Sequence, residues 1–130
     1  MHRWALTALV LLLAGPAWAH GLECPAHAPA DWHASPGVLN GVQVLSAKQG
    51  EKIDEQSPPT LVPDDHSTRN GVLHSVWQVN GEGPDWQFFV WCHYAGSERL
   101  VKLAAPGVKR CEHTAPAAHP DRSPQAMVCD

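Results

Sequence analysis

Histidine is the residue type whose number and spacing most strongly suggest chemistry in this sequence. Nine histidines occur in 130 residues, and His20 would become the first residue if the chain were cleaved after Ala19. An N-terminal histidine can bind copper through its amine and its imidazole ring, and the triplets Asp31-Trp32-His33 and Asp64-Asp65-His66 could complete such a site. Copper binding by His20, His33 and His66 is therefore one hypothesis for the function.

Scattered surface histidines without a metal explain the same pattern. Met127 is the only methionine after residue 19, whereas small exported copper carriers commonly have a methionine-rich run, because thioether ligands suit copper. We therefore expect no cofactor and no bound metal, and copper binding is the alternative.

Motifs for catalysis are absent or weak. The sequence has no Gly-x-Ser-x-Gly elbow for a serine nucleophile and no glycine-rich phosphate-binding loop. The neighbouring carboxylates Asp54-Glu55 and Asp64-Asp65 lie in loop-like sequence, where solvated acidic residues are usual. The sequence predicts a binding protein and not an enzyme.

The first 19 residues have the pattern of a secretory signal peptide. Met1-His2-Arg3 carries positive charge, Ala5 to Ala14 is apolar, and Ala17-Trp18-Ala19 is a small-residue cleavage site. Residues 20–130 would then form a single domain in the periplasm. Without Arg3 the chain has 8 basic and 13 acidic residues, so nucleic acid is an unsuitable partner. No later segment reaches the roughly 18 apolar residues that a membrane span requires.

Alternating and β-branched segments between turn residues predict a mostly β fold. Val38–Leu45 contains Asn40-Gly41, which indicates a bulge or a tight turn, and residues 46–70 have the composition of a long surface loop. We also expect strands over Val72–Val79, Trp86–Tyr94, Arg99–Leu103, Val108–Glu112 and Met127–Cys129. Trp86–Tyr94, Arg99–Leu103 and Val108–Glu112 would form an antiparallel meander of three strands. Short antiparallel strands such as these naturally enclose a core as a small antiparallel β-barrel or sandwich.

Four cysteines lie in the predicted domain, and their even number in a short exported chain indicates two disulfides. No Cys-x-x-Cys pair of a zinc site occurs. If the strand containing Cys129 returns beside the strand containing Cys111, these two come close, and Cys24 is left for Cys92. This argument favours Cys24–Cys92 and Cys111–Cys129, with the other two pairings still open.

The segment Trp86–Tyr94 is expected to be the most buried strand. Alternation places on one face Trp86, Phe88, Val90, Cys92 and Tyr94. With that face inward, Phe89 and Trp91 would point outward and form an exposed aromatic patch for a partner.

The order of several landmarks resembles a family of small, uncharacterised proteobacterial periplasmic proteins. The landmarks are Cys24-Pro25, Pro58-Pro59, Leu61-Val62-Pro63-Asp64, Ser75-Val76-Trp77, Trp91-Cys92-His93-Tyr94, Leu103, Val108, Cys111 and Cys129. That family is similar to the inhibitors of C-type lysozyme, which are small antiparallel β-barrels with disulfides. The resemblance implies a protein of this fold that binds a lysozyme or another protein of the envelope.

The resemblance also implies where the partner would bind. The lysozyme inhibitors insert a hairpin into the cleft of the enzyme, and its counterpart here begins at Tyr94 and includes Ser97. Arg99 and Lys102 would donate charge-assisted hydrogen bonds to the catalytic carboxylates of the lysozyme. The predicted partner-binding residues are Trp91, Tyr94, Ser97, Arg99 and Lys102.

Overall fold

The structure is a computed structural model of the chain, and it describes residues 21–79 and 83–130. The predicted signal peptide, residues 1–19, and His20 lie outside the described residues. The described elements are β1 (Leu22–Glu23), the 3-10 helix η1 (Ala30–Trp32), β2 (Leu39–Lys48), β3 (Asp65–Arg69), β4 (Val72–Gln78), β5 (Trp86–Tyr94), β6 (Leu100–Ala104), β7 (Arg110–Pro116) and β8 (Ala126–Cys129). None of the described helices is long and apolar enough to cross a membrane.

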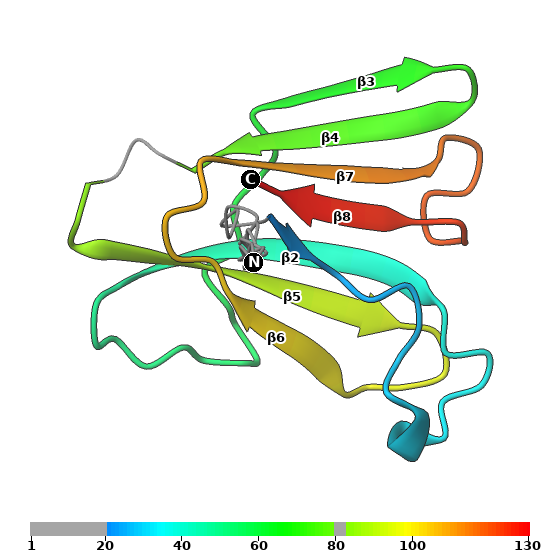
Figure 1. Cartoon of the computed structure of the whole chain (residues 1–130), viewed down its shortest axis with the longest axis horizontal. Coiled ribbons are helices and arrows are strands. Elements are labelled where there is room, and N and C mark those ends of the chain that lie inside the picture. Colours follow the sequence, from blue (N-terminus) through cyan, green and yellow to red (C-terminus); the bar gives the residue numbers. More distant parts are fainter. Residues whose placement is uncertain (1–20, 80–82) are drawn as a thin grey trace, which may run out of the picture.

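These strands form two antiparallel sheets that lie over one another (Figure 1). One sheet has the strand order β1-β8-β7-β4-β3, and the other has the order β2-β5-β6. The sequence predicts a mostly β fold that is a barrel or a sandwich. Because the two sheets do not close into one ring, the chain adopts the sandwich. The predicted bulge is confirmed, since the register of β2 on β5 shifts between Leu39 and Gly41.

The two disulfides join Cys24 to Cys92 and Cys111 to Cys129, which is the favoured pairing. Cys111 and Cys129 face each other across β7 and β8. Cys24 follows β1 in the larger sheet, whereas Cys92 lies on β5 in the smaller one. The first disulfide therefore links the two sheets, and the second lies within one sheet.

The predicted three-stranded meander is wrong, because β7 does not pair with β6. After Pro106-Gly107 the chain crosses to the larger sheet, where β7 lies between β4 and β8. Backbone hydrogen bonds fix the crossing: Val79 N donates to Lys109 O at 2.9 Å, and Lys109 N donates to Asp130 O at 2.7 Å. These partners are distant in the sequence, so local alternation could not reveal them.

The predicted loop at 46–70 is wrong at both ends. Strand β2 continues to Lys48, and Asp65–Arg69 forms β3, which pairs with β4. Asn70 and Gly71 have φ angles of 50° and 76°, which suit the two-residue turn of a hairpin. All five residues of β3 are exposed, so the strand has none of the apolar alternation that marks a strand in sequence.

The core lies between the two sheets. It contains the fully buried Leu39, Val44, Val90 and Met127, together with both disulfides. Trp77 is also buried in it, and its indole N–H donates to Leu61 O at 3.1 Å. This bond satisfies the polar group of a large buried aromatic residue, and it ties the chain that precedes β3 to the core.

Candidate protein-binding face

All five of the predicted partner-binding residues lie in the hairpin that β5 and β6 form. Trp91 and Lys102 are directly opposite each other in the register of the two strands, so their side chains share one face of the smaller sheet. Tyr94 faces the core, Ser97 lies in the turn, and Arg99 directly precedes β6. The hairpin therefore divides into an outer face with Trp91 and Lys102, and a tip with the other three.

Trp91 and Phe89 lie on the outer face of the sheet, as alternation predicted, but they do not form an exposed patch. Trp91 is only 3% exposed, Leu45 beside Phe89 is 0% exposed, and Phe89 is half-buried. The reason is a covering segment, residues 49–61, that leaves β2, passes over this face and returns to the edge of β2. Its return is fixed where Leu61 N donates to Val44 O at 2.8 Å.

Lys102 joins the covering segment to the aromatic face. Its ammonium group lies 4.8 Å from the centroid of the Trp91 ring, within the range of a cation–π contact. The same group forms an ion pair with the Glu55 carboxylate of the covering segment. The lysine side chain is 41% exposed and the glutamate side chain is 66% exposed, so another anionic group could reach the lysine.

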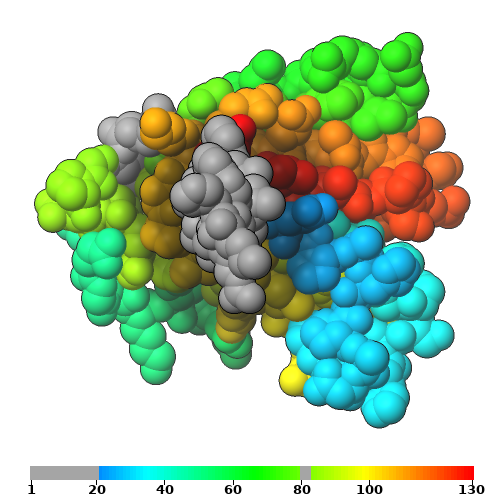
Figure 2. Space-filling view, viewed as in Figure 1, coloured from blue at the N-terminus to red at the C-terminus, as the bar shows by residue number. Residues whose placement is uncertain are grey.

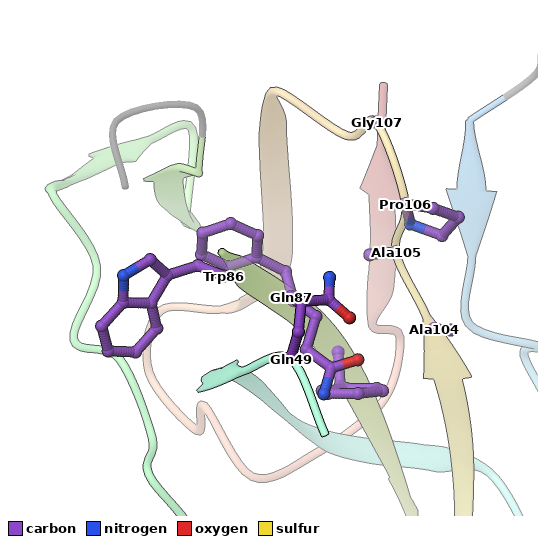
Figure 3. A pocket seen from close by; sticks show the side chains of 9 residues that line it. Gln49, Trp86, Gln87, Ala104, Ala105, Pro106 and Gly107 are labelled. Carbon is purple, nitrogen blue, oxygen red and sulfur yellow. The ribbon is translucent and has the colours of Figure 1, made fainter. Parts of the chain in front are cut away.

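Two cavities lie along β5 and β6, the first of them on the outer face. One, of about 370 Å³, is lined by Glu51, Ile53, Glu55, Phe89, Trp91, Lys102 and Ala104. The other, of about 350 Å³, is lined by Gln49, Trp86, Gln87, Phe88, Phe89, Ala104, Ala105, Pro106 and Gly107. In Figure 3, Trp86 and Pro106 lie at opposite sides of the second cavity, with the amides of Gln49 and Gln87 between them. Phe89 and Ala104 line both cavities, so the two adjoin, and we call them together the aromatic groove. The second cavity also includes Phe88, which packs against the core.

A polar cluster continues the outer face beyond Trp91. His93 Nε2 lies 2.6 Å from Gln43 Oε1, and Gln43 Nε2 donates to Thr60 Oγ1 at 3.0 Å. Burial lowers the pKa of His93 from its ordinary value, which favours the neutral ring. This cluster gives the groove an end with hydrogen-bonding groups.

The tip of the hairpin is held against the N-terminal segment and does not project freely. Tyr94 is 2% exposed, its hydroxyl donates to Pro25 O at 2.8 Å, and burial raises its pKa. Gly37 N donates to Ala95 O at 2.9 Å, and Ala95 N donates to Val38 O at 2.9 Å. Tyr94 therefore supports the tip from beneath.

Arg99 is the exposed cation of the tip. Its guanidinium carbon lies 4.7 Å from the centroid of the Trp32 ring, and Trp32 in turn meets Tyr94 edge to face, with centroids 6.1 Å apart. Ser97 Oγ accepts a hydrogen bond from Arg99 N at 3.1 Å. Arg99 and Lys102 thus both lie over a tryptophan, which holds each cation in place at the surface.

Several residues of this face were not found from the sequence. Gln43, Glu55 and Trp32 contact the hairpin from segments far away in the chain, and Thr60 is linked to it through Gln43. No local periodicity marks them. The only sequence signal was the unusual length of the segment after β2, since long loops in small domains often have a function.

The residues of the copper hypothesis are placed apart in the fold. His33 follows η1 with a positive φ of 52°, and His66 is exposed on the edge strand β3. Across residues 21–79 and 83–130, no group of three or more His, Cys, Asp or Glu side chains has the arrangement of a metal site. His20 lies outside the described residues.

Comparisons with known proteins place the chain in a family. A curated protein of Azospirillum brasilense, described as an uncharacterized 16.3 kDa protein in the trpG 5′ region, is 28% identical over 122 residues, covering 84% of this chain and 81% of the relative. No solved structure matches the chain. The family model described as "Type VI secretion system Tli immunity protein" matches residues 34–130, a range that includes β2 to β8 and thus the entire aromatic groove. The chain therefore belongs to the family of type VI secretion system Tli immunity proteins.

Proposed function

We propose that this protein is a periplasmic immunity protein that binds a toxic type VI effector and blocks it sterically. The observation that carries the proposal is the family match over residues 34–130. Two disulfides also suit a chain that works in an oxidising compartment. The neutralising step is binding alone, because an inhibitor that occupies the working surface of a toxin needs no chemistry of its own.

The outer face of β5 and β6 is the surface that we assign to the effector. It combines the half-buried Phe89 with the exposed Lys102, and the adjoining hairpin tip adds the exposed Arg99. Arginine is over-represented among residues that dominate binding energy. Trp91 and Phe89 form the floor of the groove and Lys102 is its cation, whereas Arg99 lies at the tip of the hairpin, over Trp32. Tyr94 holds the tip in place through its bond to Pro25.

The charges indicate what the effector presents. Lys102 is already paired with a carboxylate of its own chain, that of Glu55. A carboxylate of the effector can take the place of Glu55 at the same ammonium group, and Arg99 offers a second donor for a bidentate contact. The matching surface on the effector is therefore acidic at two points and apolar between them.

The test is to export candidate type VI effectors to the periplasm of a bacterial host, with and without this protein. Co-production is expected to restore growth against one effector, and titration calorimetry should then show direct binding. Lys102→Glu should weaken this binding at least tenfold, about 1.4 kcal/mol. Arg122→Glu, which makes the same charge change on an exposed loop outside the groove, should leave it unchanged.

If no effector is neutralised or bound, the proposed function is wrong. If both variants lose affinity equally, the function stands but the assigned face is wrong.

A finer version of the proposal is that the toxic partner has a lysozyme-type cleft. In this version Arg99 and Lys102 meet the catalytic carboxylates of the enzyme. Activity assays with C-type and G-type lysozymes at micromolar concentrations of this protein would test it. Inhibition that is lost in Lys102→Glu would support it. No inhibition of either enzyme would refute the lysozyme version, and the growth assay would then still test effector binding.

A further inference from the structure

Strand β3 is an edge strand whose outer side has no partner in the described part of the chain. It pairs only with β4 and lies at one end of the larger sheet. All five of its residues are exposed. On the face seen in Figure 2, the hairpin of β3 and β4 (green) forms the upper rim of the molecule, with no other segment over it.

The backbone groups on the open side of β3 follow from its pairing with β4. Arg69 and Val72 flank the two-residue turn, so they exchange hydrogen bonds, and so do Ser67 and His74 two residues further along. The N–H and C=O groups of His66 and Thr68 therefore point away from β4. Unpaired groups of this kind are a template for another strand.

The charges on β3 select the strand that fits. Asp65 and Arg69 lie at its two ends, and their register with Val76 and Val72 places both side chains on the same sheet face. Among the residues that the structure describes, neither forms a salt bridge. An antiparallel copy of β3 centred on Ser67 would place Asp65 opposite Arg69 of the copy, and Arg69 opposite Asp65 of the copy.

We propose that this protein forms a symmetric homodimer by antiparallel pairing of β3 with β3 of a second copy, centred on Ser67. In this register the outward groups of His66 and Thr68 exchange four backbone hydrogen bonds with the copy. The two Asp65–Arg69 pairs are then the non-hydrogen-bonded cross-strand pairs, in which side chains approach most closely. The two larger sheets become one continuous ten-stranded sheet.

Other registers use these groups less well. Moving the centre to His66 places Asp65 opposite Ser67 of the copy, and moving it to Thr68 places Arg69 opposite Ser67 of the copy. Each shift removes both opposite-charge pairs. The charges thus favour self-pairing in this one register. Pairing with an unrelated strand is what a charged edge normally discourages.

Sedimentation equilibrium of the exported, disulfide-bonded protein over a concentration series tests the proposal. Wild type is expected to show a monomer–dimer equilibrium. Asp65→Arg and Arg69→Asp should each weaken the dimer at least tenfold, because like charges then meet across the axis. The double variant, with both charges exchanged, should recover wild-type association. An equimolar mixture of the two single variants should form a heterodimer, since one then has two basic ends and the other two acidic ends.

A second variant tests the backbone contacts. Thr68→Pro removes an outward N–H without touching the bonds to β4, so it should abolish the dimer while thermal unfolding remains cooperative. A monomeric wild type at the highest soluble concentration would overturn the proposal. Failure of the double variant to recover association would overturn the register. Protection of the β3 amides from exchange only after a partner protein is added to a monomer would assign this edge to that partner, and would also overturn self-pairing.

Discussion

Gly96, in the turn between β5 and β6, lies directly against the backbone of Ser35 in the N-terminal segment. Its φ is +83°, and a Cβ at this position would overlap the Ser35 carbonyl group. The close approach brings the hairpin tip onto the chain that carries Trp32, and Trp32 in turn lies under Arg99. One glycine therefore couples the tip of the proposed interface to the N-terminal segment.

Gly96→Ala should destabilise the protein by more than about 2 kcal/mol, because it adds a steric overlap to the cost of a positive φ. Gly107→Ala is the matched control: its φ is +70°, but nothing lies within 4 Å of the added carbon. It should cost only about 1 kcal/mol. Urea unfolding at pH 7.5 measures both, and equal costs would show that the contact with Ser35 has no energetic role.

The two disulfides should differ in their contribution to stability. Cys24 and Cys92 are 68 residues apart, and Cys111 and Cys129 are 18 apart. A single disulfide typically contributes about 2–5 kcal/mol to the free energy of unfolding. In the chain-entropy model the bond that closes the longer loop contributes about 1 kcal/mol more than the other. We expect Cys24→Ser/Cys92→Ser to lower the free energy of unfolding more than Cys111→Ser/Cys129→Ser does. The opposite order in urea unfolding would contradict the entropic account.

His113 should make the protein less stable in mild acid. It lies on the inner side of β7, with Nε2 2.7 Å from Gln125 Oε1, and burial lowers its pKa, opposed in part by this hydrogen bond. Below about pH 6.5 the unfolded chain binds a proton that the folded protein does not yet accept, so stability falls as the pH drops. One such group contributes a slope of at most about 1.4 kcal/mol per pH unit.

His113→Gln is therefore expected to reduce the loss of stability between pH 8 and pH 5.5. At pH 8 both side chains are neutral, so the stability difference between the two proteins there reports only the packing cost of the variant. The quantity to compare is therefore the change in the free energy of unfolding of each protein between pH 8 and pH 5.5. Urea unfolding of both proteins at each pH gives this difference. An unchanged loss would mean that other groups cause the acid sensitivity.

Glu55→Gln should leave stability almost unchanged and alter binding. Its ion pair with Lys102 is largely exposed, so its loss should change the free energy of unfolding by less than about 1 kcal/mol. Freed from Glu55, Lys102 should bind an acidic partner faster, most clearly at low salt. Glu23→Gln, an exposed charge on β1 of the other sheet, is the control. Stopped-flow association with the effector would show whether the two variants differ.

The strands with apolar alternation could be predicted from the sequence, but their assignment to sheets could not. The segment Trp86–Tyr94 and the bulge near Gly41 are marked by their own residues, and the disulfide pairing followed from the return of the last strand. The position of β7 depends instead on hydrogen bonds from Lys109 to Asp130 and from Val79 to Lys109. These are contacts of the tertiary structure, and no local pattern encodes them.

The candidate site likewise has a part that could be predicted from the sequence and a part that could not. Alternation placed Trp91 and Phe89 on the outer face correctly, because the period of a strand is local. The burial of Trp91 depends on the covering segment, whose single anchoring apolar residue over this cavity is Ile53, and on an ion pair between residues 55 and 102. Sequence alone gives no reason to fold that segment back over the sheet.

The covering segment lies apart from the residues that hold the protein together, on the face that we propose for the partner. The core and both disulfides lie between the sheets, whereas Glu51–Gln56 is mostly exposed and touches the groove chiefly through Ile53 and Glu55. Substitutions in this stretch can therefore accumulate over evolutionary time with little penalty to folding. A lineage of such proteins can in this way retain one scaffold while its recognition diverges to keep pace with a changing toxin.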